Sequence, residues 1–395
     1  MKIKYFFLLF LLPFLKPIYS QVQLSVYSEI SIVTAGPGTE LYEAFGHSAI
    51  RIKDPVLRLD LIYNYGIFDF NAPNFYGNFV KGKLLYKLGR YDFKYFVESY
   101  NRQNRWVKQQ ILNLDQKQKQ AFFLFLENNA QPKNASYFYD PYYNNCATKL
   151  RDITLSILGD KVTFHDSHLE KNQSLRQLMG KEISWNTWGS FGINLALGSK
   201  LDTKATSDQY MYLPDYVFSA FKNATVLKNN QLESLVKKEE TLLEFKELEQ
   251  EISLLNPLLI FLIITVIGLY ITYKDFKNKK RTKWFDFVLF FSTGFMGVII
   301  ILLWFFTDHS TTPNNFNFLW AFAPNLAIAF LFLKNNPQKW VQKYMLLLLL
   351  LLLFIPILWV SNIQVFSFAM IPLLILFFVR YLFLSRLLSA KNRSV

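Results

Sequence analysis

The stretch YYNNCATKLRD (residues 142–152) contains the only cysteine in a chain of 395 residues. Two asparagines precede Cys146 and the residues after it have helical spacing, so we expect a helix capped by Asn144 or Asn145. A thiol at a helix start lies beside free backbone N–H groups and the positive end of the helix dipole, which lower its pKa. A lone cysteine is more often a buried packing residue, so the surrounding sequence has to decide between the two interpretations.

The two ends of the sequence predict an exported, membrane-bound protein. Residues 1–20 place two lysines before a short apolar run that ends at Ser20, which is the pattern of a cleaved signal peptide. Beyond residue 255 there are five apolar runs of about the length that crosses a bilayer as a helix: 257–273, 285–306, 316–333, 344–360 and 365–384. We therefore predict five transmembrane helices over 256–384 and a cytoplasmic tail over 385–395.

Basic residues orient these predicted spans. The thirteen Lys and Arg residues of the membrane region lie at 274–283, at 334–343 or from Arg380 onward, whereas 307–315 and 361–364 contain none. The positive-inside rule makes the basic side cytoplasmic, so the residues before the first span are extracytoplasmic, in agreement with a signal peptide. The spans carry almost no ionisable residues, which indicates a wall toward the lipid rather than a transport path.

The net charge of +14 at pH 7 mostly reflects this membrane orientation. Residues 21–250 carry 27 basic and 25 acidic side chains, so the exported part is nearly neutral. It contains no basic stripe of the kind that binds nucleic acid, and we therefore expect no nucleic-acid partner.

Residues 21–227 predict one extracytoplasmic α+β domain. Segments rich in β-branched and aromatic residues predict strands at 28–36, 47–53 and 59–68, with a turn at 53–57. Helical spacing predicts helices at 93–104, 114–129 and 146–158, with Asp115 as an N-cap and Gly159 as a C-terminal stop. Residues 228–255 have a charged amphipathic pattern, which predicts a juxtamembrane stalk helix leading into the first span.

His47 is the candidate base for the thiol. It stands in AFGHSAIRI (44–52) at the head of a predicted strand, from which its ring can point toward a neighbouring helix start or simply be a strand-end histidine. If the next two strands form a hairpin, Asn64 can lie opposite His47 and accept its Nδ1 proton, with Tyr63 and Asp60 as competitors. The HxxH spacing of His165 and His168 has no ligand cysteine beside it, so we expect no metal site and no cofactor.

Together these segments resemble a known family. A histidine strand, then IYNYG (62–66), then NNCATKLRD (144–152) on a helix resembles the circularly permuted papain-like (NlpC-type) architecture. The resemblance is closer still to the Lnb family of membrane-bound lipoprotein N-acyltransferases, and it is carried by residues 33–52, 63–70, 138–152 and 307–320. It implies an α+β permuted papain-like domain followed by a five-helix bundle, with Cys146 as nucleophile, His47 as base and a lipoprotein as substrate.

The favoured function is thiol acyl transfer. Moving an acyl chain from an ester to an amine through a Cys146 thioester replaces one difficult step by two easier ones, and His47 would carry the proton. We expect lipoproteins and membrane lipid as substrates, with the catalytic domain in the periplasm and the spans in the bacterial inner membrane. The acyl donor is either the lipoprotein's own glyceride, which the resemblance favours and which makes the transfer an intramolecular migration, or a separate phospholipid.

Two other functions stay open at this point. An NlpC-type cysteine hydrolase acting on peptidoglycan or lipid would use the same thiol, although such a hydrolase needs at most one membrane anchor. A non-enzymatic membrane scaffold would use Cys146 only for packing and should tolerate its replacement by serine.

Four charged or polar residues are candidates for substrate binding. Arg151 and Asp152 follow Cys146 by five and six positions, on other faces of the helix, and form either a structural ion pair or a contact to a lipid headgroup. Asp308 and His309 begin the outer loop between the second and third predicted spans, and they either cap and solvate that loop or contact the substrate at the membrane surface.

Overall fold

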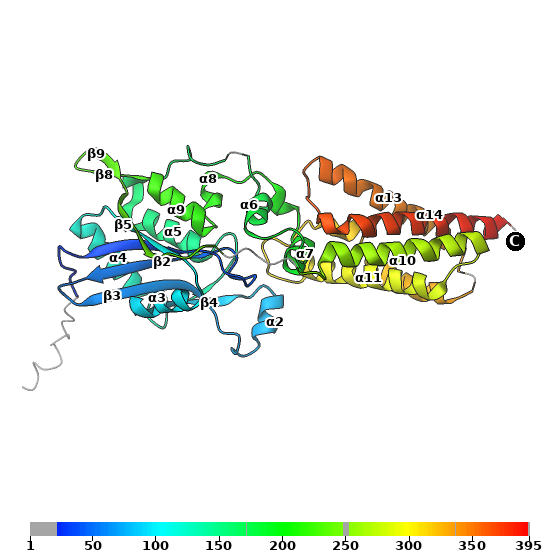
Figure 1. The fold of residues 1–395 in the computed structure, drawn as a ribbon, viewed down its shortest axis with the longest axis horizontal. Coiled ribbons are helices and arrows are strands. Elements are labelled where there is room, and N and C mark those ends of the chain that lie inside the picture. The colour runs from blue at the N-terminus through cyan, green and yellow to red at the C-terminus, as the bar shows by residue number, and fades with distance from the viewer. Residues whose placement is uncertain (1–21, 171, 248–252, 336, 394–395) are drawn as a thin grey trace, which may run out of the picture.

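The computed structural model describes residues 22–393 except 171, 248–252 and 336. The described chain forms an α+β domain followed by a helical membrane region, and the two parts meet end to end along the long axis of the molecule (Figure 1). Residues 1–20, predicted as a signal peptide, lie outside the described range.

A seven-stranded sheet forms the centre of the described α+β domain, with the order β10-β5-β1-β2-β3-β4-β6 and antiparallel pairing throughout. Its strands are β1 (Glu29–Ala35), β2 (His47–Asp54), β3 (Leu59–Ile67), β4 (Leu85–Asp92), β5 (Val107–Leu112), β6 (Ser136–Phe138) and β10 (Val236–Leu243). The first three confirm the strands predicted from the sequence. The other four have no predicted counterpart.

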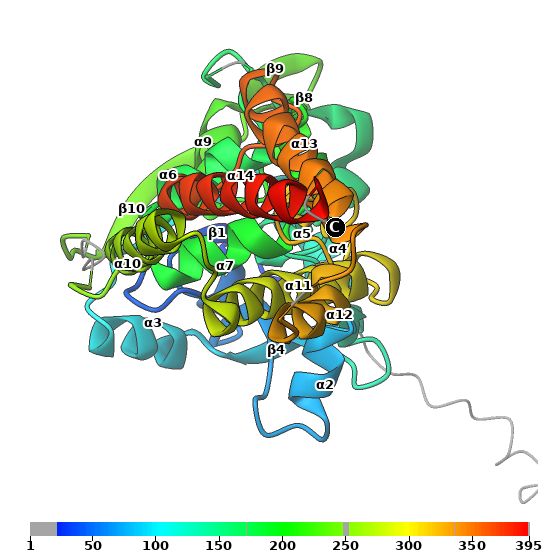
Figure 2. The same ribbon diagram turned by 90° about the vertical axis from the view of Figure 1, so that its right-hand side faces the viewer.

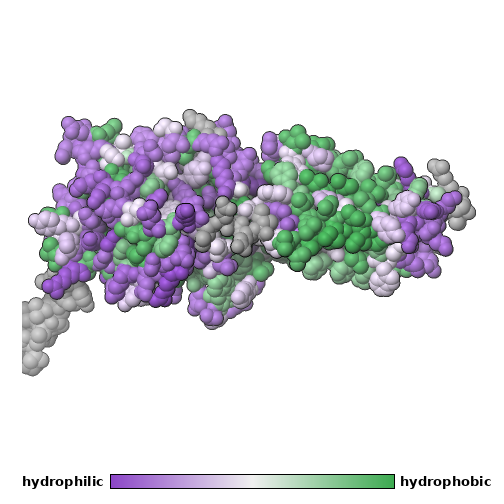
Figure 3. Space-filling model, in the orientation of Figure 1, coloured by the Kyte–Doolittle hydropathy of each residue, from purple (hydrophilic) through white to green (hydrophobic). Residues whose placement is uncertain are grey.

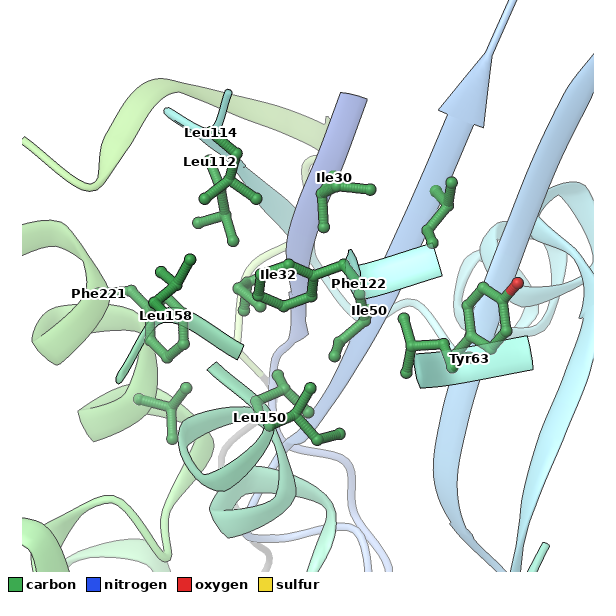
Figure 4. Packing of buried hydrophobic residues seen from close by; sticks show 14 of the residues in the cluster. Ile30, Ile32, Ile50, Tyr63, Leu112, Leu114, Phe122, Leu150, Leu158 and Phe221 are labelled. Carbon is green, nitrogen blue, oxygen red and sulfur yellow. The ribbon is translucent and has the colours of Figure 1, made fainter. Parts of the chain in front are cut away.

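Helices cover both faces of this sheet. The helices of the described domain are α2 (Phe75–Val80), α3 (Phe93–Arg102), α4 (Gln116–Asn129), α5 (Cys146–Leu158), α6 (Leu175–Glu182), α7 (Trp188–Ala196), α8 (Ser207–Tyr210) and α9 (Pro214–Asn223). α4, α5 and α9 pack on one face over a core that includes Ile32, Ile50 and Phe122 (Figure 4), and α3 packs on the other face. Asp115 caps α4 as predicted and Gly159 follows α5, so the helix predictions in the domain are confirmed.

The predicted stalk helix at 228–255 is wrong wherever this segment is described. Asn229 and Asn230 both have positive φ, 47° and 63°, and form the tight turn between β8 (Thr225–Lys228) and β9 (Gln231–Ser234), which make a small second sheet with β7 (Val162–Thr163). β10 then pairs with β5 at the edge of the large sheet, where Gln110 donates to Glu239 and Gln109 to Glu240. Backbone hydrogen bonds with the edge of β5 stabilise this charged segment as a strand, although its own pattern favours a helix.

The membrane region has four helices that are long and apolar enough to cross a bilayer, counted over the described residues. They are α10 (Pro257–Asn278), α11 (Lys283–Phe305), α13 (Val341–Val360) and the helix Phe368–Ala390, which comprises a 3-10 turn and most of α14 (Ile371–Arg393). Four candidate spans therefore stand where the sequence predicts five. Figure 3 shows the broad apolar surface of this region beside the more polar domain.

The third predicted span, 316–333, is broken into short pieces. Two 3-10 turns (Phe316–Leu319 and Phe330–Leu333) flank α12 (Asn325–Ala329), because Pro324 has no backbone N–H to continue a helix. Gly294 and Gly297 of α11 let this segment approach closely: a Cβ on Gly294 would lie 2.0 Å from the backbone nitrogen of Leu326. The segment still joins both ends of the bundle, since Asn317 bonds Leu195 at the domain end and Lys334 accepts from Arg281 at the other.

Buried charges tie three membrane helices together. The guanidinium of Arg380 on α14 lies 2.8 Å from Asp275 of α10 and 2.6 Å from Asp286 of α11, and Arg281 lies 3.1 Å from Asp286. The bundle therefore contains buried charged side chains, whereas we expect almost no ionisable residues in the spans from the sequence. The four groups pair with one another at the end away from the domain, so they clamp the helices rather than line a path.

Candidate active site

Cys146 is the first residue of α5, and Asn145 sets that position. The Asn145 side-chain oxygen accepts from the backbone N–H groups of Ala147 and Thr148, both at 2.9 Å, while the Thr148 hydroxyl accepts from the Asn145 N–H. The Asn145 amide nitrogen donates to the carbonyl of Tyr212 at 2.7 Å, which anchors the cap to the rest of the domain. Asn145 rather than Asn144 is therefore the cap, and the buried thiol lies at the first turn, where Asn145 satisfies the N–H groups of Ala147 and Thr148.

His47 begins β2 and reaches the thiol from the neighbouring strand. Gly46 before it has φ 70°, and a Cβ there would lie 2.9 Å from the carbonyl oxygen of Ala35, so the turn into β2 requires glycine. The ring Nε2 of His47 donates to the Oδ1 of Asn64 at 2.5 Å, and the ring is also hydrogen-bonded to the thiol of Cys146. The structure thus brings all three predicted residues together.

The predicted arrangement of the imidazole is wrong in one respect. Asn64 bonds Nε2, whereas the sequence predicts an Nδ1–Asn64 bond. The β2–β3 register explains this, because Ile50 pairs with Tyr63 and the continued register puts Asn64 diagonal to His47 on one face rather than directly opposite it. The competitors are occupied elsewhere: Tyr63 donates to Glu127 and Asp60 pairs with Arg51.

The pKa values of the pair shift in the directions that favour an ion pair. Burial alone would raise the pKa of Cys146, but the positive charge and hydrogen bond of His47 and the backbone N–H groups of Ser48 and Ala147 lower it below its usual value. Burial alone would lower the pKa of His47, but the charge and hydrogen bond of Cys146 and the bond to Asn64 raise it. Both shifts widen the pH range in which thiolate and imidazolium coexist.

This end of the sheet faces the membrane region. The loop before Cys146 contains Asp140, whose carboxylate accepts from the N–H groups of Tyr142 and Tyr143 at 2.9 and 3.0 Å and from the hydroxyl of Ser310. Ser310 lies in the loop that follows α11, on the side of the bundle nearest the domain (Figure 1). The thiol itself lies in the α+β domain. Asp140, six positions before Cys146 in the sequence, contacts the membrane region directly.

Two family models match the chain. One, described as the Lnb N-terminal periplasmic domain, matches residues 18–179, and the other, described as the Lnb transmembrane domain, matches residues 249–392. The chain belongs to the Lnb family. No curated protein and no solved structure matches it. With a periplasmic domain and a transmembrane domain, this Lnb-family chain is a multi-pass membrane protein, and Cys146, His47 and Asn64 all lie in the matched periplasmic part.

The outer loop of this Lnb-family chain docks on the domain through its backbone. The N–H of Asp308 donates to the carbonyl of Lys81 at 2.9 Å, and the backbone of His309 lies against Gly82, where a Cβ would be 2.6 Å from its nitrogen. The carboxylate of Asp308 is exposed and the ring of His309 is half-buried. The structure places Asp308 and His309 at the junction of domain and bundle. Neither residue makes a contact given above with Cys146 or His47.

Arg151 and Asp152 pair with each other. Their charged groups are 2.7 Å apart, and Arg151 also donates to the carbonyl of Asp208 in α8 at 2.6 Å. This geometry favours the structural alternative, in which the pair clamps α5 to α8, over a contact with a lipid headgroup.

The HxxH histidines lie outside the site. His165 bonds the Thr225 hydroxyl at 3.0 Å, and His168 lines a cavity of about 20 Å³ beside α8 and α9. Across the described residues no group of three or more His, Cys, Asp and Glu side chains is placed to hold a metal ion.

Tyr91, Tyr137 and Ser48 belong to the site but are not predicted from the sequence. The Tyr91 hydroxyl accepts from the Asn64 amide nitrogen at 2.9 Å, which orients Oδ1 toward His47. A Cβ placed on Gly66 would lie 4.0 Å from the Tyr137 hydroxyl and 3.7 Å from the Cβ of Cys146, so the hydroxyl and Cys146 lie near the same point. Burial, followed by the charge of Cys146, raises the pKa of Tyr137, so this hydroxyl stays protonated and can donate. The contacts of Tyr91 and Tyr137 come from strand pairings that the sequence does not reveal, whereas Ser48 follows His47 on a predicted strand.

Proposed function

We propose that this protein is a membrane-bound thiol acyltransferase that N-acylates lipoproteins at the periplasmic face of the bacterial inner membrane. Membership of the Lnb family suggests an enzyme of lipoprotein biogenesis. The observation that carries the proposal is the line Cys146–His47–Asn64, with the thiol at a helix start and the imidazole held by an amide. The same order of residues, histidine on a strand before cysteine on a helix, supports a permuted papain-like fold for the domain.

In the first half-reaction Cys146 attacks a lipid ester. The thiolate adds to the ester carbonyl, and the donors that we propose for the developing oxyanion are the backbone N–H of Cys146 and the Tyr137 hydroxyl. The C–O bond then breaks and the imidazolium of His47 gives its proton to the leaving alkoxide. The products are an S-acyl Cys146 and a free alcohol, with His47 now neutral.

In the second half-reaction an amine takes the acyl group. The α-amine of the lipoprotein's N-terminal cysteine attacks the thioester, and neutral His47 accepts the proton that this amine loses. Collapse of the tetrahedral intermediate breaks the C–S bond and restores the thiolate–imidazolium pair. An amide replaces an ester, so no external energy source is needed.

The donor we propose is the lipoprotein's own glyceride, which makes the reaction an ester-to-amine migration. The alternative donor is a phospholipid. The contact between Ser310 and the loop before Cys146 supports a donor at the periplasmic surface of the inner membrane, because this contact holds the thiol next to the end of the bundle. Asp308 and His309, at the same junction, remain our proposed contacts to the substrate.

The test is the intact mass of one lipoprotein's N-terminal peptide from cells with the wild-type protein, with Cys146→Ala, or with the control Ser156→Ala on the exposed face of α5. Migration predicts a blocked amine with an unchanged number of acyl chains for wild type and control, and a free amine for Cys146→Ala. A gain of one chain would identify a phospholipid donor. An unaltered peptide combined with loss of peptidoglycan cross-links would replace the proposal by a cysteine hydrolase.

A further inference from the structure

α2 exposes apolar side chains where a soluble domain would bury them. None of its residues is buried, and Tyr76, Phe79 and Val80 have 70%, 48% and 60% of their surface exposed. Phe70 in the preceding loop is 48% exposed. A cluster of exposed aromatic and aliphatic side chains on a projecting element indicates a surface that another phase or molecule covers.

The position of α2 identifies what covers it. The carbonyl of Lys81, which follows Val80 directly, accepts from the N–H of Asp308 at 2.9 Å. Asp308 comes two residues after Phe306, at the domain end of α11, where Phe305 and Phe306 are 65% and 72% exposed. The exposed face of α2 thus continues the lipid-facing surface of a membrane helix at the level where that helix leaves the bilayer.

α2 also lies beside the bundle rather than on top of it. Viewed along the bundle axis, α2 projects beyond the outline of the membrane helices, next to α11 and α12 (Figure 2). A bilayer around the bundle would therefore lie beneath α2, and none of the described membrane helices lies in between. The exposed Lys81 and Lys83 follow the apolar residues, a combination that suits the boundary between acyl chains and phosphate groups.

A series of aromatic rings links α2 to the thiol. The successive ring centroids are 6.3, 6.1, 5.0 and 4.4 Å apart along Phe79, Phe75, Phe68, Tyr86 and Tyr139. The series ends at Gly66, because a Cβ on this glycine would lie 3.6 Å from the Tyr139 ring and 3.7 Å from the Cβ of Cys146. The last ring and Cys146 therefore lie beside the same point of β3, at Gly66.

We propose that α2 inserts into the outer leaflet beside the bundle and that this ring series guides a lipid acyl chain from the leaflet to Cys146. Insertion of α2 is independent of the chemistry, whereas the guidance of an acyl chain rests on the proposed acyl transfer. Rigid aromatic rings suit this role because the exposed ones at the α2 end offer apolar surface to a flexible chain at little cost in conformational entropy, and the buried Tyr86 connects them to the ring beside Cys146. The ring series thereby brings an ester that resides at the membrane surface within reach of a thiol in the periplasmic domain.

Insertion is tested with a fluorophore on the full-length protein in vesicles of phosphatidylethanolamine and phosphatidylglycerol. The label is placed at Tyr76→Cys in a Cys146→Ser background, and the matched control is Tyr95→Cys on α3, an equally aromatic position that is 55% exposed and far from the bundle (Figure 1). We expect nitroxide-labelled lipid to quench the Tyr76 label and aqueous iodide to quench the Tyr95 label. Equal quenching of both labels by iodide overturns insertion, and shielding of the Tyr76 label from both quenchers overturns it in favour of a protein partner.

The guidance of the acyl chain is tested with Tyr76→Ser/Phe79→Ser, which leaves Cys146 in place, against Tyr95→Ser. We expect transfer from a vesicle-embedded lipoprotein to fall about tenfold in the double variant and to stay unchanged in the control. The alkylation rate of Cys146 by iodoacetamide should stay at the wild-type value in both, which separates lost access from a damaged site. Wild-type transfer by the double variant overturns the guidance role. Absence of transfer by the wild type itself would instead count against the proposed function and leave the quenching result to decide insertion.

Discussion

Two buried polar clusters, one in each region of the molecule, differ in what they leave unpaired. In the membrane region Arg380 and Arg281 face Asp286 and Asp275, so every charge has an opposite charge within 3.1 Å. In the periplasmic domain the His47 ring bonds a neutral amide through Nε2 and interacts with the Cys146 thiol. The charges of the first cluster are fully paired. In the second cluster a proton can move between the thiol and the imidazole.

This difference separates a clamp from a candidate catalytic site. Fully paired buried charges resist change, because removing any partner leaves an uncompensated charge in a low-dielectric environment. A thiol and an imidazole with opposite pKa shifts exchange a proton at little cost, so they can activate a nucleophile and later protonate a leaving group. We therefore expect substitutions in the bundle to affect stability and substitutions around Cys146 to affect turnover.

The largest expected effect is on turnover at the thiol. Cys146→Ala and His47→Ala should each lower N-acyl transfer by about 10⁴-fold or more, and the double substitution should be little worse, because neither group works without the other. Initial rates of the purified variants, reconstituted in vesicles with a diacylated lipoprotein, measure this. Losses that multiply in the double variant would mean that the two residues do not act as one unit.

Arg380→Met tests the clamp. It leaves two buried carboxylates with one guanidinium, so we expect a loss of about 3–5 kcal/mol in the stability of the bundle. The thermal unfolding midpoint in detergent reports it, with Arg386→Met, an exposed arginine six residues further along α14, as the control. A midpoint equal to that of the control would show that the ion pairs contribute nothing net.

Asn64→Ala removes the hydrogen bond that orients the His47 ring but keeps the imidazole itself, so it tests the candidate catalytic site without deleting its base. Turnover should fall by up to about 10²-fold, since the ring loses the group that orients it. The Asn64 bond raises the pKa of His47, so its loss lowers that pKa. The imidazolium is present only below this pKa, and the alkaline limb of the pH profile of kcat/KM should therefore move to lower pH while the acid limb stays. An alkaline limb at the wild-type position would contradict a positioning role for Asn64.

Asp152→Asn should have the smallest effect. The Arg151–Asp152 pair is partly solvated, with 47% of the Asp152 side chain exposed, and such pairs contribute at most about 1 kcal/mol. We expect a wild-type unfolding midpoint within experimental scatter and unchanged transfer. A selective loss of transfer with intact stability would restore the headgroup contact that the sequence also allows.

The candidate site was largely predictable because its signals are local. An asparagine before an apolar-periodic run predicts the helix start at Cys146, and a glycine before a β-rich run predicts His47 at a strand end. Asn64 follows from the short hairpin between β2 and β3. Which ring nitrogen Asn64 binds does not follow from these signals, because the diagonal register of two twisted strands decides it.

Contacts distant in sequence explain what was missed. Tyr91 reaches Asn64 only because β4 pairs with β3, with Gly89 opposite Asn64, and nothing local at residue 91 indicates that pairing. The same holds for Tyr137, whose three-residue strand β6 exists only as an addition to β4. Short edge strands have weak patterns of their own, and their neighbours determine them.

By itself the sequence determined the features that depend on near neighbours and on the solvent: helix caps, apolar runs long enough for a membrane, the one-sided basic residues, and the pairing of one cysteine with one histidine strand. The tertiary structure decided the rest. Residues 236–243 became a strand because the edge of β5 offered unpaired backbone groups, although their own pattern favours a helix. Residues 316–333 became a broken segment at Pro324, and Gly294 and Gly297 of α11 admit its backbone at a distance that side chains there would prevent. For residues 236–243 the free energy of contacts made across the fold exceeded a local preference of a few tenths of a kcal/mol per residue. The break at Pro324 is a local effect, but the apolar length of 316–333 alone does not indicate it.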